Sequence, residues 1–150
     1  MSIAANLDWE LHQLDIKNAF LNGSLEEEVF MRIPPGFESS ENQNKVCKLK
    51  KALYGLKQSP RAWFTKFSAT MNKLGYQQGQ DDHIVFIKQT INGKSILIVF
   101  VDDMSLIGND VVGVQLKKCL KSEFKVKDVG TLKYFLGLEI ARSKKGIFIT

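Results

Sequence analysis

Residues 95–107 read Ser-Ile-Leu-Ile-Val-Phe-Val-Asp-Asp-Met-Ser-Leu-Ile. Two apolar, strand-forming runs flank Asp102 and Asp103, so the pattern predicts a β-hairpin that carries both carboxylates at its tight turn. Adjacent carboxylates in an apolar setting repel each other and lose hydration, which favours a nearby cation. Hard divalent cations suit carboxylate oxygens. Aspartate is also frequent in turns because its side chain bonds nearby backbone amides, so the pair alone fits a structural turn better than a metal site.

Composition indicates a globular chain with a real core. Its 150 residues are 44% hydrophobic and 25% charged, which predicts one domain. The net charge of +5 is compatible with a nucleic-acid partner. Cys47 and Cys119 are expected to be reduced thiols. Neither a bilayer-spanning stretch nor a signal peptide is apparent, so we expect an intracellular protein of the cytoplasm or nucleus that is not secreted and does not contact membranes.

Hydrophobic periodicity predicts a succession of strands with two complete helices. Ser59 as N-cap and Pro60 predict the start of a helix that Gly75 ends, and a second amphipathic helix is predicted over Asp110–Phe124. The end of a further helix is expected at Ser2–Asn6. Strands are predicted at Glu10–Ile16, Glu26–Ile33, Val46–Leu49, Ile84–Ile87, Ser95–Val101, Met104–Ile107, Tyr134–Ile140 and Ile147–Ile149. This order predicts an α+β fold, a split βαβ or ferredoxin-like antiparallel-rich sheet with helices on one face.

A third carboxylate has a similar setting far upstream. Asp15 lies at the end of the first predicted strand, where the chain turns into a short apolar segment. In a split βαβ sheet the first strand neighbours the Asp102–Asp103 hairpin, so the three carboxylates are expected to converge at one sheet edge. Such a cluster can hold two metal ions roughly 3.5–4 Å apart, the arrangement used for in-line displacement at phosphorus.

Five segments, in order along the chain, resemble the reverse transcriptases of copia-type long-terminal-repeat retrotransposons. They are Gln13-Leu-Asp-Ile-Lys-Asn-Ala-Phe-Leu-Asn-Gly23, Val29-Phe-Met-Arg-Ile-Pro-Pro-Gly-Phe37, Leu49-Lys-Lys-Ala-Leu-Tyr-Gly-Leu-Lys-Gln-Ser-Pro-Arg-Ala-Trp63, Phe100-Val-Asp-Asp103 and Phe135-Leu-Gly-Leu-Glu-Ile140. The resemblance implies a polymerase palm with a partial fingers portion. It further implies an RNA-directed DNA polymerase that joins dNTPs to a primer on an RNA or DNA template.

Site roles follow from this resemblance by position. The catalytic, metal-binding carboxylates are Asp15, Asp102 and Asp103, which would hold two Mg²⁺ ions, with Mn²⁺ as the alternative. The implied nucleotide-binding residues are Ile16, Phe20, Tyr54 and Gly55. The implied template and primer contacts are Gln58, Ser59, Pro60, Leu136 and Gly137.

Several of these residues also have structural interpretations. Phe20 alone would be read as a core aromatic, and Gly137 alone as a strand bulge. Lys125, Lys127 and Lys133 lie where the family often has a lysine near the departing pyrophosphate, and the sequence does not select one of them. Solvated surface charge is the simpler interpretation for most of these lysines.

The resemblance also implies what lies outside residues 1–150. We expect a truncated palm-type domain without the N-terminal fingers, the thumb or the ribonuclease H region of the polyprotein, so the isolated fragment should have little or no activity. The alternative is a catalytically inactive remnant with at most weak, salt-sensitive nucleic-acid binding. An unrelated two-metal phosphohydrolase would not need the Tyr54–Trp63 segment.

Overall fold

The computed structural model describes residues 4, 6–91, 93–108, 110–143 and 146–150. The chain divides into two compact units, the first formed by residues 1–18 with 68–150 and the second by residues 19–67. The helix end predicted at residues 2–6 lies largely outside the described residues. The single palm-type domain stays a prediction.

The first unit is built on a six-stranded sheet in the order β4-β5-β6-β7-β1-β8, and every neighbouring pair is antiparallel. This confirms the antiparallel-rich α+β architecture. The strands are β1 (Glu10–Ile16), β4 (Gln77–Gln78), β5 (Val85–Thr90), β6 (Gly93–Phe100), β7 (Asp103–Gly108) and β8 (Val126–Thr131).

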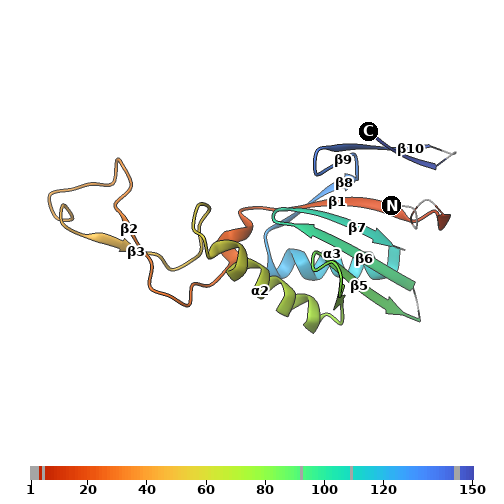
Figure 1. The fold of residues 1–150 in the computed structure, drawn as a ribbon, viewed down its shortest axis with the longest axis horizontal. Helices are drawn as coiled ribbons and strands as arrows, with labels where there is room; N and C mark the ends of the chain where they lie inside the picture. The colour runs from red at the N-terminus through yellow and green to blue at the C-terminus, as the bar shows by residue number, and fades with distance from the viewer. Residues whose placement is uncertain (1–3, 5, 92, 109, 144–145) are drawn as a thin grey trace. The chain divides into compact units, whose positions relative to one another are not determined.

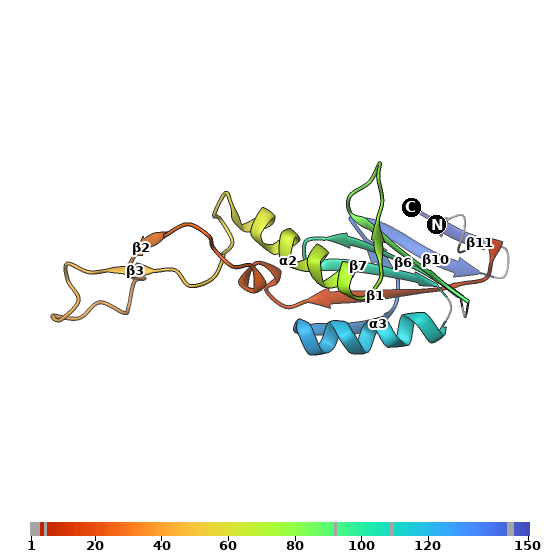
Figure 2. The same ribbon diagram turned by 90° about the horizontal axis from the view of Figure 1, so that it is seen from below.

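The two faces of this sheet are covered differently. Helix α3 (Asp110–Glu123) packs on β6, β7 and β8 through its buried residues Val112, Leu116 and Leu120. The opposite face carries a second core that includes Leu11, Ile96, Ile107, Phe135 and Ile140. That core joins the sheet to the three-stranded layer of β9 (Tyr134–Phe135), β10 (Leu138–Ser143) and β11 (Gly146–Ile149). Figures 1 and 2 show α3 and β10 on opposite sides of the sheet.

Helix α2 (Ser59–Lys73) has the predicted extent but a different N-cap. The carbonyl of Gln58 accepts the N–H of Ala62 at 3.0 Å, which makes Gln58 the N-cap residue. The buried Ser59 hydroxyl instead donates to the carbonyl of Leu53 at 2.5 Å. The predicted Ser59 cap is therefore wrong, because the preceding turn provides a closer acceptor for the hydroxyl.

The C-terminal end of α2 is a Schellman motif, as Gly75 predicted. Gly75 has φ +78°, its N–H bonds to the carbonyl of Asn72, and the N–H of Tyr76 bonds to the carbonyl of Met71. Tyr76 and Met71 are both buried, which supplies the apolar contact that accompanies this motif. Across the described residues, no helix has the length and apolar character needed to cross a bilayer.

The second unit contains the hairpin of β2 (Phe30–Arg32) and β3 (Val46–Lys48), together with the 3₁₀ helix η1 (Ala19–Asn22). Antiparallel pairing places Met31 opposite Cys47, so the strand predicted at Val46–Leu49 does pair with the Glu26–Ile33 segment. The N–H of Ala52 bonds to the carbonyl of Gly23 at 3.2 Å and ties the end of this hairpin back to η1.

A partly buried ion pair fastens α3 to β8. Lys117 Nζ lies 3.0 Å from Asp128 Oδ2, and the Gly130 N–H donates to the Oδ1 atom of Asp128. Burial raises the pKa of Asp128, but the hydrogen bonds from Lys117 and Gly130 and the nearby cationic charge outweigh it, and the net pKa is lowered. The ionised form of Asp128 therefore stabilises the folded state.

Replacing Asp128 by Asn should destabilise the chain by about 1 kcal/mol at pH 7, because a charge-assisted contact is lost. The folded pKa lies below the unfolded one, so the contribution of Asp128 is present above about pH 4 and is lost as the pH falls through the folded pKa. Urea unfolding at pH 7 and at about pH 2 measures the difference, because the contribution of Asp128 is lost only below about pH 4. Lys118→Met, which removes an exposed charge from the same helix, is the control. A pH-independent difference between D128N and wild type would contradict the assignment.

Candidate active site

Antiparallel pairing of β1 with β7 brings the distant carboxylates together. Asp15 pairs directly with Asp103, and the backbone N–H of Ile16 donates to the carbonyl of Asp102 at 2.9 Å. Directly paired residues of antiparallel strands project their side chains from the same face of the sheet. The convergence of Asp15 with the Asp102–Asp103 hairpin, which the sequence predicted, is therefore present in the fold.

The hairpin turn is shifted by one residue from its prediction. Phe100 pairs with Asp103, so the two-residue loop is Val101-Asp102 and Asp103 is the first residue of β7. Val101 has φ +53°, in the left-handed region that β-branched residues rarely adopt. Such backbone strain is characteristic of functional turns, because the surrounding structure must hold it in place.

Three rows of side chains follow one another along the carboxylate face of β1, β7 and β6. The first row is apolar and consists of Leu11, Ile107 and Ile96. The next row consists of Gln13, Ser105 and Ile98. The last, which we call the acidic row, consists of Asp15, Asp103 and Phe100. The face therefore changes from buried core to acidic edge over two rows. Period-two spacing from Asp15 and Asp103 identifies Gln13 and Ser105, which the sequence analysis did not single out.

A bulge in β8 determines which β8 residue pairs with Asp15 at the end of the acidic row. The pairing of β1 with β8 shifts between Gln13, which faces Gly130, and Leu14, which faces Asp128. Beyond this shift Asp15 pairs with Lys127. Of the three lysines that the sequence left open, Lys127 is therefore the one placed directly beside a carboxylate by strand register.

The surroundings of Asp103 disfavour the ionised form of its carboxyl group. Burial raises the pKa of Asp103, and the negative charges of Asp15 and then Asp102 raise it further. The carboxylates are close enough to repel one another. Among the residues described by the structure, however, no three His, Cys, Asp or Glu side chains are gathered closely enough to hold a metal ion.

The nucleotide-binding residues predicted from the family segments lie mainly in the second unit. Phe20 is only 8% exposed and its ring centroid lies 4.3 Å from that of Tyr54, which is 52% exposed. Phe20 is thus a packed aromatic in contact with the more exposed ring of Tyr54. Gly55 has φ +90° in the turn after Tyr54. Ile16, in the first unit, is buried, and its N–H bonds to the Asp102 carbonyl.

The predicted template and primer residues are divided between the units. Gln58, Ser59 and Pro60 form the start of α2, where Pro60 is exposed and Ser59 is buried. Leu136 and Gly137, with φ +53° and +81°, form the two-residue turn between β9 and β10. This turn replaces the bulge that Gly137 alone would indicate. Through β9 and β10 it belongs to the layer on the carboxylate side of the sheet.

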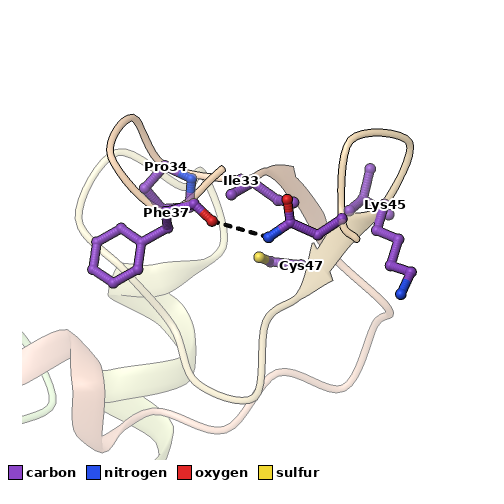
Figure 3. A pocket seen from close by; sticks show the side chains of 7 residues that line it. Ile33, Pro34, Phe37, Lys45 and Cys47 are labelled. Atoms are coloured by element: carbon purple, nitrogen blue, oxygen red, sulfur yellow. Dashed lines mark hydrogen bonds between the residues drawn. The ribbon is translucent and has the colours of Figure 1, made fainter. Parts of the chain in front are cut away.

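A separate open pocket lies on the β2–β3 hairpin of the second unit. Its volume is about 430 Å³, and the lining residues are Ile33, Pro34, Phe37, Asn42, Lys45, Val46 and Cys47. Asn42 Nδ2 donates a hydrogen bond to the carbonyl of Phe37 at 2.9 Å. Figure 3 marks this bond by a dashed line at the Phe37 carbonyl. None of the residues predicted to be catalytic, metal-binding or nucleotide-binding lines it.

Comparison with known proteins identifies the class of this chain. Residues 1–150 match the family described as reverse transcriptase (RNA-dependent DNA polymerase), and the chain belongs to that family. It is 44% identical over 146 residues to the retrovirus-related Pol polyprotein from transposon TNT 1-94 of Nicotiana tabacum, covering 96% of this chain and 11% of that protein. It is 40% identical over 153 residues to the corresponding polyprotein from transposon RE1 of Arabidopsis thaliana, covering 100% of this chain and 10% of that protein.

These relatives confirm the predicted resemblance to retrotransposon reverse transcriptases. The chain spans about a tenth of the length of the two polyproteins. No solved structure matches it.

Replacing Asp103 by Asn should stabilise the metal-free chain, because it removes one of the like charges that face each other across β1 and β7. The folded pKa of Asp103 is raised, so its ionisation weakens the fold as the pH rises above about 4. We expect a gain of about 0.2–1 kcal/mol at pH 7. Thermal unfolding in EDTA measures it, with Asp81→Asn, an exposed loop carboxylate, as control. A D103N chain less stable than wild type would contradict the assignment.

Proposed function

We propose that this chain is the palm-centred part of an RNA-directed DNA polymerase, which joins a dNTP to a primer 3′-hydroxyl by two-metal nucleotidyl transfer. The observation that carries the proposal is the register of β1 with β7, in which Asp15 faces Asp103 and the chain turns at Asp102. Asp15 and Asp103, which are 88 residues apart in sequence, thereby share one strand pair. Family membership supports the same reaction.

Asp15, Asp102 and Asp103 are the residues that would hold the metal ions. Their all-oxygen donor set suits Mg²⁺ or Mn²⁺, and their mutual repulsion, expressed in the raised pKa of Asp103, would be relieved by a divalent cation. When bound, the two ions would activate the primer hydroxyl and stabilise the leaving pyrophosphate. The carboxylates must rotate toward one another to share a cation.

Other residues of the chain would position the reactants. Lys127, directly beside Asp15 in β8, would add positive charge next to the departing pyrophosphate. The β9–β10 turn at Leu136-Gly137 would hold the primer. Phe20, whose ring contacts that of Tyr54, would lie under the sugar of the incoming nucleotide and exclude a ribose 2′-hydroxyl. Gln58, Ser59 and Pro60 would contact the template.

The second candidate function is weak nucleic-acid binding without catalysis. The net charge of +5 favours it, because phosphate contacts by Lys and Arg need no metal site. The three intact carboxylates favour catalysis instead. The two candidates differ in their metal dependence, because only catalysis requires a divalent cation.

Single-nucleotide extension of oligo(dT) on poly(A) with Mg²⁺ should be slow and should fall by more than about 100-fold in Asp102→Asn and Asp103→Asn, since even indirect support of a metal ligand is worth 10- to 100-fold. Asp81→Asn is the matched control. Extension that survives both D102N and D103N would overturn the site assignment. Salt-sensitive template binding with no extension by wild type would favour the non-catalytic function.

Replacing Phe20 by Val should raise the ratio of ribonucleotide to deoxyribonucleotide addition by about 10-fold or more, because the ring that excludes the 2′-hydroxyl is gone. Phe30→Val, which alters an exposed phenylalanine of the same unit, should leave the ratio unchanged. The readout is the addition of rUTP against dTTP in the same extension assay. An unchanged ratio in a folded F20V chain would remove Phe20 from the nucleotide site.

A further inference from the structure

Ser105 is a buried polar residue that packing does not explain. Its side chain is 0% exposed, and its Oγ atom has no hydrogen-bond partner among the described residues. A buried hydroxyl without a partner destabilises the fold relative to alanine, because it has lost its hydrogen bonds to water. The other two fully buried serines of the described residues have hydrogen-bond partners: Ser59 donates to the carbonyl of Leu53, and Ser95 accepts from the Tyr76 hydroxyl at 3.0 Å.

The position of Ser105 relates it to the acidic row. It lies two residues after Asp103 on β7, and its partners Gln13 and Ile98 separate the apolar row from the acidic one. Residues two apart on a strand share a face and stand roughly 6.8 Å apart. A serine hydroxyl and an aspartate carboxylate that lean toward each other along the strand span this distance with one hydrogen bond.

Three features that lower stability are concentrated on the same hairpin. Val101 is held in the left-handed region, Asp103 faces the like charge of Asp15, and Ser105 buries a hydroxyl without a partner. Residues that serve function and lower stability are concentrated at active sites. Ser105 therefore belongs with the site rather than with the neighbouring core.

We propose that Ser105 is a positioning residue. When the Asp103 carboxylate rotates to bind a divalent cation, the Ser105 hydroxyl, which has no partner in the metal-free structure, donates a hydrogen bond to it and holds it in the binding orientation. This inference rests on the proposed function, because it requires Asp103 to be a metal ligand. The hydroxyl orients the ligand and does not touch the metal. Outer hydrogen bonds of this kind fix ligand orientation and alter metal affinity by about 10- to 100-fold.

Calorimetric titration of the full 150-residue chain with Mn²⁺ alone tests the proposal. Ser105→Ala should weaken Mn²⁺ affinity by about 10- to 100-fold while leaving the melting temperature of the metal-free chain unchanged or raised. Ser105→Thr, which retains the hydroxyl, should restore affinity to within about threefold of wild type. Ser95→Ala is the matched control: it should lower the melting temperature, because the Tyr76 hydroxyl loses its acceptor, and leave Mn²⁺ affinity unchanged.

The outcomes separate this inference from the proposed function. If wild type binds no Mn²⁺, or D103N binds it as tightly as wild type, the metal site itself is wrong. If wild type binds and S105A binds equally tightly, only the role of Ser105 is overturned. If Gln13→Leu weakens Mn²⁺ affinity as much as S105A does, the Ser105 hydroxyl bonds to Gln13 rather than to Asp103. That result would also overturn the proposal. Should S105A fail to fold, Ser105→Cys, close in volume but a weak donor, carries the same test.

Discussion

The pairing of β1 with β7 is the constraint on which the candidate site depends. It pairs residues 10–15 with residues 103–108 and places Asp15 opposite Asp103. It also allows the Ile16 N–H to donate to the Asp102 carbonyl. The apolar ends of the same strands are fixed by two cores, one under α3 and one under β9–β11. Because a one-residue slip would turn every side chain to the other face, burial of both faces defines where the carboxylates stand.

Local signals in the sequence were sufficient for most elements. Alternating apolar residues located β1, and apolar runs located β6 and β7. Helical spacing located α2 and α3, and Gly75 marked the Schellman motif. The helix start at Ser59 was right, but its capping role was not, because side-chain hydrogen bonds depend on the path of the preceding turn. The hairpin was likewise right, while its two-residue loop proved to be Val101-Asp102, since loop register depends on which residues pair.

The candidate site was predictable in its charged members and not in its supporting ones. Asp15, Asp102 and Asp103 stand out because carboxylates contrast with apolar strands. Ser105 does not stand out, and Lys127 could not be selected from the three candidate lysines, because cross-strand register is not contained in a linear pattern. Local pattern also did not reveal the Phe20–Tyr54 ring contact, in which two segments of the second unit meet.

The bulge in β8 determines the sign of the charge beside Asp15. With Val129 inserted, Asp15 lies beside Lys127 while Asp128 turns toward α3 and Lys117. If β8 paired regularly beyond Gly130, Asp128 would instead stand beside Asp15 and add a third negative charge to the acidic row. One extra residue thus decides whether the neighbour of Asp15 attracts or repels an anion. An insertion or deletion in β8 would therefore reverse the charge beside Asp15 without changing Asp15, Asp102 or Asp103.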